Sequence, residues 1–457
     1  MEAPADLLIS DAELVATVDD DRREIAGGWV AVTDGLVSGV GGPGDPRQTA
    51  TRTVDARGCL VTPGLVNTHH HLYQNLTRAF APALKGGLFE WLVTLYPRWA
   101  RLDEEAAHIS AWVGLVELAL SGCTTSTDHL YVHPRGAGDL IAAEIAAARE
   151  LGVRFHPTRG SMSLSVKDGG LPPDSVVQDD DEILAESQRL VEAHHDRAPG
   201  AMTRIALAPC SPFSVSTSLM TRTAELAEHL DVRLHTHLCE TRDEDAFCLE
   251  TFGRRPVDYL ADVGWMTDRT WLAHVVWPSP DEVTRLGAAR VGAAHCPSSN
   301  MILGSGLSPV AELRAAGAPV GLGVDGSASA DSASLWLEAR TAMLQGKLRH
   351  GAGAMSARDA LEVATRGGAA CLGRTGEIGE LSVGACGDLV VWGLDGVRFA
   401  GALSDPVEAW LRCGPVVARH TVVAGRLVVE DGAPVHAGLD EQLAVHRRVS
   451  ERMQAAV

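Results

Sequence analysis

The sequence has no apolar run of the roughly 20 residues that a membrane-spanning helix needs. Its opening stretch, MEAPADLLISDAEL, also lacks the basic and long apolar regions of a signal peptide. We therefore expect a cytoplasmic protein with no membrane partner.

Paired cysteine motifs are also missing. The chain has nine cysteines, an odd number, and no CxxC pair among its 457 residues. This pattern excludes a dense disulfide framework and is typical of reduced thiols in a reducing compartment. We expect most of these cysteines to behave as small core residues.

Basic residues are scarce relative to acidic ones. Lys and Arg total 39 against 59 Asp and Glu, which gives a formal net charge of −20. Such a surface repels phosphate backbones, so nucleic acid is excluded as a partner. The 46% hydrophobic content is that of an ordinary globular protein, and the length suits a large barrel with a small appendage.

Both ends of the chain carry short β-prone runs separated by Gly and Asp. These runs are residues 7–9, 29–32 and 36–37 near the start, and 389–392, 421–423 and 427–429 near the end. We predict one small β-sandwich domain built from both termini, residues 1–62 plus 376–457.

The middle of the chain alternates strand-like and helix-like segments. The predicted strands are residues 153–156, 204–207, 232–235, 270–274, 291–295 and 320–325, and helices are expected at 104–120, 183–195, 218–229 and 357–371. This repeat predicts an α/β fold, a (β/α)8 TIM-like barrel over residues 63–375. Polar residues end several of these strands, where such barrels place their active sites.

The clearest motif is a histidine triplet after a short apolar run. His69 and His71 are two residues apart, so at a strand end both imidazoles point to one side and can share a metal ion. A surface histidine cluster is the alternative, but an internal position after a strand favours metal binding.

A second group follows the strand around residue 235. His237 can supply a third imidazole, and Glu240, three residues later, can move protons to and from a metal-bound water. The alternative is a strand end with a solvent-facing glutamate. His235 shares the strand face of His237, and we expect it to have a supporting role.

Two further strand ends complete the set. His274 could contact the ion or hydrogen-bond its water, although a lone histidine in such a place is often structural. Asp325 could fill the remaining ligand position and shuttle a proton, although Asp-Gly is also a common turn. Imidazole and carboxylate ligands with an open position for water fit one divalent ion, Zn²⁺ or Fe²⁺.

The motifs PGLVNTHHH, HTHLCE, LAHVV, HCPSSN and GVDGSAS resemble the amidohydrolase superfamily, in its mononuclear deaminase and chlorohydrolase branch. The resemblance covers essentially the whole chain. It implies that His69, His71, His237 and Asp325 bind the metal. It also implies that Glu240 is the proton shuttle and that His274 polarises the attacking water.

The same resemblance bears on metal count and substrate. Binuclear members use a lysine after the fourth strand, and residues 204–211 contain none, so one ion is implied. Several stretches, among them HLYQ, FEWL and APCSPFSVS, are similar to bacterial 8-oxoguanine deaminases, which convert 8-oxoguanine to urate and ammonia. An isocytosine- or guanine-type deaminase and an s-triazine hydrolase (dechlorination or N-dealkylation) are the alternatives. The triazine hydrolase has threonine where this chain has Asp325, which favours deamination.

Substrate contacts are expected from three residues. Gln74 could bind a purine edge through its amide, and Trp91 could cover the ring. Cys210 could touch the ring, and residues 295–300 could line the pocket. For each of these residues a purely structural role is the alternative.

These features lead to an enzyme that acts on a small purine- or pyrimidine-like substrate. A non-catalytic relative would have lost ligands, and this chain keeps every proposed one. A homo-oligomer is possible, because relatives often assemble.

Overall fold

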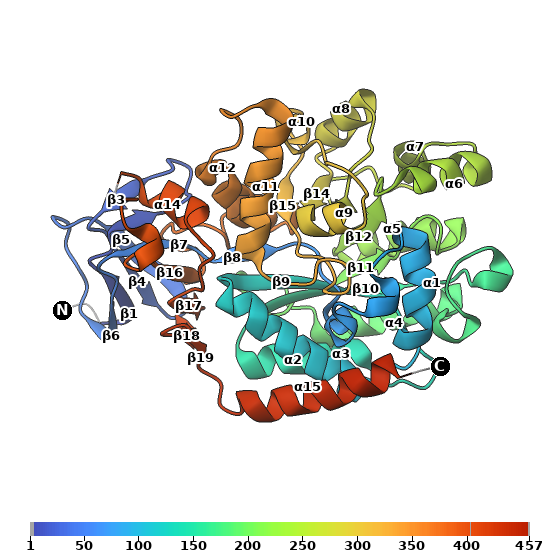
Figure 1. Ribbon diagram of the computed structural model, residues 1–457, viewed down its shortest axis with the longest axis horizontal. Helices are drawn as coiled ribbons and strands as arrows, with labels where there is room; N and C mark the ends of the chain where they lie inside the picture. The colour runs from blue at the N-terminus through green and yellow to red at the C-terminus, as the bar shows by residue number, and fades with distance from the viewer. Residues whose placement is uncertain (1–3, 403, 456–457) are drawn as a thin grey trace.

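A computed structural model describes residues 4–402 and 404–455 of the chain. A helix-clad barrel forms the larger part and β-sheets lie beside it, with strands from both ends of the chain (Figure 1). Residues 1–3, 403 and 456–457 lie outside the described residues, although the domain prediction includes residues 1–3 and 456–457 at its ends.

Eight parallel strands close the barrel in the order β10-β11-β12-β13-β14-β15-β8-β9. Their bounds are β8 Leu65–Asn67, β9 Cys123–Leu130, β10 Arg154–Ser161, β11 Ala206–Pro209, β12 Arg233–Leu238, β13 Thr270–His274, β14 Gly292–His295 and β15 Val320–Leu322. The predicted barrel is therefore confirmed.

Trp271 of β13 fills part of the barrel interior. It is fully buried, and its indole Nε1 donates to the carbonyl of Thr68 at 2.9 Å. Room for it comes from β14, because a Cβ at Gly292 would lie 2.9 Å from the Trp271 Cβ. A large side chain therefore faces a glycine, as close packing of a small barrel requires.

Helices surround the strands. Their bounds are α1 Leu88–Trp99, α2 Glu104–Leu120, α3 Leu140–Leu151, α4 Asp180–His194, α5 Thr217–Leu230, α6 Arg242–Phe252, α7 Pro256–Asp262, α8 Pro280–Ala288, α9 Pro297–Ile302, α10 Val310–Ala315, α11 Leu335–His350, α12 Ala357–Glu362, α13 Gly368–Cys371, α14 Pro406–Arg412 and α15 Leu439–Gln454. Among the described residues, none of these helices has both the length and the apolar character to span a bilayer.

One predicted helix is interrupted. Residues 357–371 form α12 and α13 with a π-helical turn, η5 Val363–Gly367, between them. A Cβ at Gly367 would lie 2.1 Å from the Val320 carbonyl, and one at Gly368 would lie 2.9 Å from Val66. The glycines let this turn pack directly on the barrel strands, which helix periodicity alone does not reveal.

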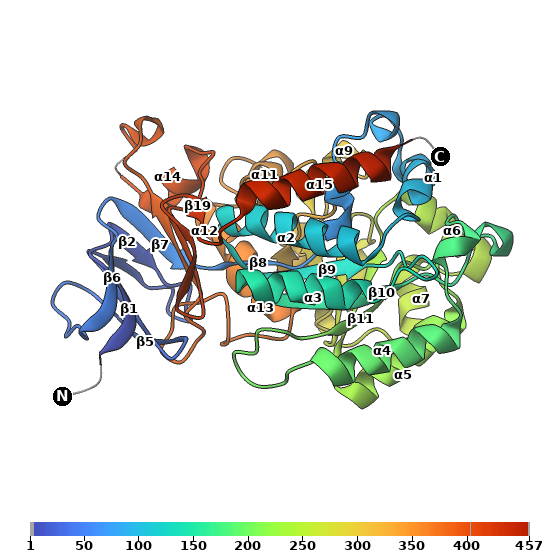
Figure 2. The same cartoon turned by 90° about the horizontal axis from the view of Figure 1, so that it is seen from below.

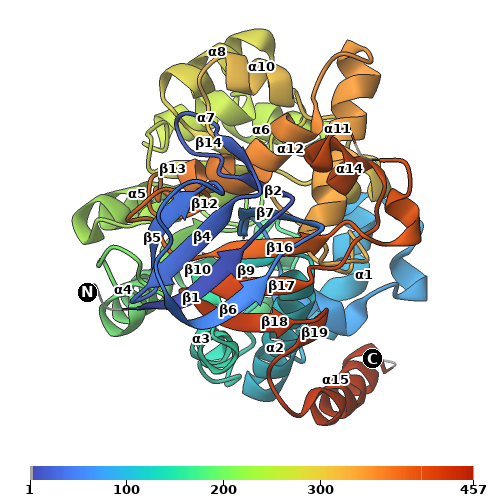
Figure 3. The same cartoon turned by 90° about the vertical axis from the view of Figure 1, so that its left-hand side faces the viewer.

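Two further sheets hold the strands from both termini (Figure 3). One has the order β5-β4-β1-β6 and the other β19-β18-β17-β16-β7-β2-β3. Their bounds are β1 Ala5–Ser10, β2 Leu14–Ala16, β3 Glu24–Ala26, β4 Trp29–Thr33, β5 Leu36–Gly41, β6 Ala50–Asp55, β7 Cys59–Pro63, β16 Leu389–Gly393, β17 His420–Val423, β18 Arg426–Glu430 and β19 Ala433–Pro434. Strand β7 pairs antiparallel with β16, with Val61 opposite Val391, so the two ends of the sequence share a sheet.

A buried ion pair joins these sheets to the barrel. Arg154, which begins β10, donates to both carboxylate oxygens of Asp388 at 2.9 and 3.0 Å. Both side chains are almost fully buried. Asp388 also accepts from the Ala424 amide at 2.7 Å.

The last helix lies away from the predicted small domain. Helix α15 runs along α2 and the 3-10 segment η1 Leu72–Thr77 (Figures 1 and 2). Its buried Val449 and Met453 belong to the barrel core, because the apolar side of this amphipathic helix covers barrel helices. The predicted range 376–457 placed it with the β-sandwich. The rest of the proposed domain division stays a prediction.

Candidate active site

The histidine and acidic residues singled out from the sequence gather at the carboxyl ends of the barrel strands. They lie at the ends of β12 and β13 or in the segments that follow β8, β12 and β15, and each is less than 10% exposed; they are His69, His71, His237, Glu240, His274 and Asp325. The structure thus brings together side chains up to 256 residues apart (69 to 325).

Their spacing fits one metal ion. The His71 and His237 Nε2 atoms are 3.2 Å apart, and Asp325 Oδ1 lies 3.5 Å from His69 Nε2 and 3.4 Å from His71 Nε2. Zinc bonds of about 2.0–2.1 Å place tetrahedral ligand atoms about 3.3–3.4 Å apart. The buried Nε2 of His69 also has no hydrogen-bond partner among the described residues. These residues could therefore hold a divalent ion between them.

The other ring nitrogens are fixed by the barrel. His71 Nδ1 donates to the carbonyl of His129 at 2.7 Å, and His237 Nδ1 donates to that of Cys210 at 2.6 Å. Burial lowers the pKa of both rings, which favours the neutral form. In that form each Nε2 keeps its lone pair, which is what a metal ligand requires.

Glu240 and His274 face each other beside this cluster. Glu240 Oε2 lies 3.5 Å from His274 Nε2, and His274 Nδ1 donates to the Asn300 side-chain oxygen at 3.0 Å. Burial raises the pKa of Glu240. A carboxyl group with a raised pKa can both accept and return a proton near neutral pH, as acid–base catalysis requires.

The backbone is strained where it presents these groups. His274 has φ 74°, Val275 φ 47°, Asp325 φ 60° and Cys239 φ 56°. Positive φ is uncommon for residues with a Cβ and rare for a β-branched valine. Such strain persists where the surrounding fold holds it, and it clusters at functional sites.

The fold and the ligand geometry agree with comparisons to known proteins. Residues 60–428 match the model of the Amidohydrolase family. The chain belongs to this family. The 8-oxoguanine deaminase of Pseudomonas aeruginosa is 50% identical over 94% of this chain and 96% of that protein. The hydroxydechloroatrazine ethylaminohydrolase of Pseudomonas sp. (strain ADP) is 36% identical over 95% of this chain and 88% of that protein.

A solved relative extends the agreement to the whole fold. The atrazine chlorohydrolase TrzN from Arthrobacter aurescens TC1, in complex with zinc, superposes with a TM-score of 0.93. It is 34% identical and covers 97% of this chain and all of its own. The superfamily expected from the motifs is thus confirmed.

All three proposed substrate contacts of this amidohydrolase line a pocket next to the cluster. The Gln74 Oε1 is buried without a partner among the described residues, and Trp91 Nε1 donates to the Ala328 carbonyl at 3.2 Å. Burial raises the pKa of the Cys210 thiol to about 12, so this cysteine stays protonated and inert. Apolar and aromatic side chains complete the walls; they are Leu88, Leu92, Tyr96, Tyr131, Phe213 and Leu303.

The described residues 295–300 do not line this pocket, although the sequence suggested that role for them. Asn300 instead binds His274, and His295 faces a separate hollow that Gln345 also lines. His295 is the last residue of β14, and its side chain points to the opposite side from that of Ala294, which packs in one buried cluster with Trp271. The segment therefore orders the site from behind.

Sequence reasoning missed two supporting residues. Glu244 accepts from the amides of Cys239 and Glu240 at 2.9 and 2.8 Å and so fixes the loop that carries Glu240. His129 belongs to the same cluster of imidazole nitrogens within 4.8 Å. It precedes the last residue of the strand Cys123–Leu130, as His237 does in Arg233–Leu238, so the rule used for His237 could have found it.

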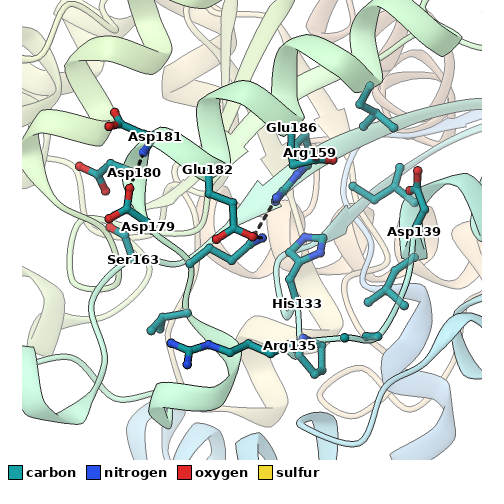
Figure 4. Close-up of a pocket in the computed structure, with 18 of the residues that line it drawn as sticks. His133, Arg135, Asp139, Arg159, Ser163, Asp179, Asp180, Asp181, Glu182 and Glu186 are labelled. Carbon is teal, nitrogen blue, oxygen red and sulfur yellow. Dashed lines mark hydrogen bonds between the residues drawn. The ribbon is translucent and has the colours of Figure 1, made fainter.

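A larger hollow lies outside the barrel between α3 and α4 (Figure 4). It measures about 940 Å³ and is lined by acidic and basic side chains that pair with each other, such as Arg189 with Asp139 at 2.7 Å and Arg222 with Asp181 at 2.6 Å. Buried Arg159 donates to the Gln178 side-chain oxygen at 2.7 Å. Its size alone does not make it the active site, because the proposed ligands lie elsewhere.

Proposed function

We propose that this amidohydrolase deaminates 8-oxoguanine by metal-dependent hydrolysis, giving urate and ammonia. The observation that carries the proposal is the pairing of Glu240 with His274 directly beside three imidazoles and Asp325. The substrate is supported by the 50% identity to an 8-oxoguanine deaminase over 94% of the chain.

We propose that His69, His71, His237 and Asp325 hold one ion, with Zn²⁺ favoured over Fe²⁺ because TrzN was solved with zinc. When bound, such an ion supplies Lewis acidity that brings the pKa of water toward about 7. β11 Ala206–Pro209, the fourth barrel strand, has no lysine, which supports a single ion.

The protein residues then move the protons. Glu240 takes one proton from the attacking water and gives it to the ring nitrogen next to the carbon that bears the amino group. The water oxygen bonds to that carbon, Asp325 accepts the second water proton, and the amino group leaves as ammonia after receiving it. His274 lies 3.5 Å from Glu240 and 3.9 Å from Asp325, so it can orient both carboxylates during these transfers.

We further propose that Gln74 binds the purine edge. Gln74 lines the pocket, its buried side-chain oxygen has no partner among the described residues, and an amide both accepts and donates. A buried unpaired polar group costs about 1–3 kcal/mol unless a ligand satisfies it.

The proposal includes the cytoplasm as the place of action. All nine cysteines are free thiols, which supports a reducing compartment. The expected homo-oligomer stays a prediction.

Ammonia release from purified enzyme tests the function. We expect kcat/KM to be highest for 8-oxoguanine in a panel that also holds guanine, isocytosine and hydroxylated triazines, and elemental analysis should find about one ion per chain. Turnover of the triazines alone would contradict the proposal. It would instead support the main alternative, a triazine hydrolase, which rests on the 36% identity to hydroxydechloroatrazine ethylaminohydrolase. Two ions per chain would contradict the single-metal site.

A further inference from the structure

A second imidazole lies directly behind His69. His235 Nε2 is 2.8 Å from His69 Nδ1, and His235 Nδ1 is 2.8 Å from the carbonyl oxygen of Trp271. All three residues are at most 1% exposed. His69 thus lacks the carboxylate or carbonyl partner that usually sits behind a metal-binding histidine.

The chain of hydrogen bonds has one direction. A carbonyl oxygen can only accept, so His235 Nδ1 carries the proton and donates to Trp271. In a neutral ring the Nε2 of His235 is then the acceptor, and His69 Nδ1 must donate to it. His69 Nε2 then carries no proton and has a free lone pair.

That lone pair faces a carboxylate. His69 Nε2 lies 3.5 Å from Asp325 Oδ1 and has no hydrogen-bond partner among the described residues. Two acceptors at this distance repel each other unless a cation lies between them. The hydrogen bonds behind His69 therefore prepare the position for a metal ion.

Trp271 holds this arrangement rigid. Its ring stacks on His235 with centroids 4.4 Å apart and planes at 19°. Its indole also donates to the carbonyl of Thr68, the residue before His69. One buried side chain therefore fixes both His235 and the backbone of the ligand that His235 contacts.

We propose that His235 is a positioning residue for the metal site. It selects the tautomer of His69 that leaves Nε2 free for a divalent cation, and Trp271 keeps His235 in place for this task. The inference rests on the proposed function only in taking His69 as a ligand.

Zinc affinity of the metal-free protein, measured by competition with a chromogenic chelator, tests this role without using turnover. His235→Leu removes the acceptor, and we expect affinity to fall about 10–100-fold, as for other partners of metal ligands. His235→Gln should bind zinc nearly as well as the wild type, because its amide oxygen can accept from His69 while its nitrogen donates to Trp271.

His156 on β10 provides the matched control. It is also a buried imidazole beside Trp271, with ring centroids 6.1 Å apart, but neither ring nitrogen has a partner in the described part of the chain. His156→Leu should leave zinc affinity unchanged. The rise in Tm on adding zinc should likewise shrink for His235→Leu and persist for His156→Leu.

Three results would overturn the role of His235. They are equal zinc affinity in His235→Leu and wild type, equal losses in His235→Leu and His156→Leu, and no recovery in His235→Gln. If His235→Leu does not fold, His235→Asn replaces it, since its shorter amide cannot reach His69 and should weaken binding. A wild-type protein that binds no zinc would instead contradict the metal-dependent function itself.

Discussion

The two ends of the barrel handle buried polar groups in opposite ways. At the end next to the small sheets, Arg154 donates to both oxygens of Asp388 and to the Gly200 and Ala201 carbonyls. At the other end, His69 Nε2 and Gln74 Oε1 are buried without partners among the described residues. Paired charges stabilise the first end, whereas the second keeps atoms available for ligands, as expected where barrels place stability and catalysis.

The largest effect should come from Glu240→Gln. We expect kcat to fall about 10⁴-fold, the upper range for acid–base catalysis, because this group serves in more than one proton transfer. Zinc content should stay at the wild-type level, since Glu240 is not a proposed ligand. Full activity, or loss of the metal, would contradict its role as the proton shuttle.

Removing the Arg154–Asp388 ion pair at the opposite end of the barrel should affect stability instead. Asp388→Ala leaves Arg154 buried without its counter-charge, so urea denaturation should show a loss of about 3–5 kcal/mol. The metal-loaded protein should keep its kcat at temperatures where it is folded.

An exposed ion pair gives the control for this comparison. Arg254 and Asp262 are 58% and 56% exposed. Asp262→Ala should cost less than about 1 kcal/mol. Equal losses in Asp388→Ala and Asp262→Ala would remove the distinction between the two ends.

A buried carboxyl pair predicts how stability varies with pH. Asp128 accepts from the Leu72 amide at 2.6 Å, and burial raises its pKa to about 8; burial and Asp128 also raise the pKa of fully buried Glu144. The folded protein thus retains protons on this pair that the unfolded chain releases near pH 4. Stability from this pair is present at low pH and is lost as pH rises toward about 8.

Glu144→Gln tests this dependence. The amide of the variant cannot ionise, so the variant lacks the proton that Glu144 retains in the folded wild type. The free energy of unfolding of wild type minus variant should decrease by up to about 1.4 kcal/mol per pH unit between pH 5 and 8. A difference that does not change with pH, or that grows, would contradict the retention of a proton by Glu144.

The smallest effect on turnover should come from Gln74→Leu. Removing an amide whose oxygen has no partner in the described part of the chain should leave Tm unchanged or higher, while kcat/KM for 8-oxoguanine falls about 10-fold. A large loss of stability with unaltered kcat/KM would show that Gln74 has a structural role and does not bind the substrate.

Strand-end reasoning located the cluster because parallel barrel strands bring their carboxyl ends to one rim. The alternation of strand-like and helix-like segments was enough to place His69, His237 and Asp325 at this rim. It could not show that His235 contacts His69, since that bond joins residues 166 positions apart. The positive φ of His274 and the docking of α15 also depend on packing that no local pattern records.

The position of α15 has a consequence for how the protein is made. His446 binds the Asn75 side chain at 2.8 Å, and Ser450 and Gln454 donate to the Leu76 carbonyl at 2.7 and 2.9 Å. These bonds brace the turn that directly follows His71. During synthesis all eight barrel strands leave the ribosome before residues 439–454 do. The turn after His71 therefore gains its hydrogen bonds to α15 only when nearly the whole chain has been made.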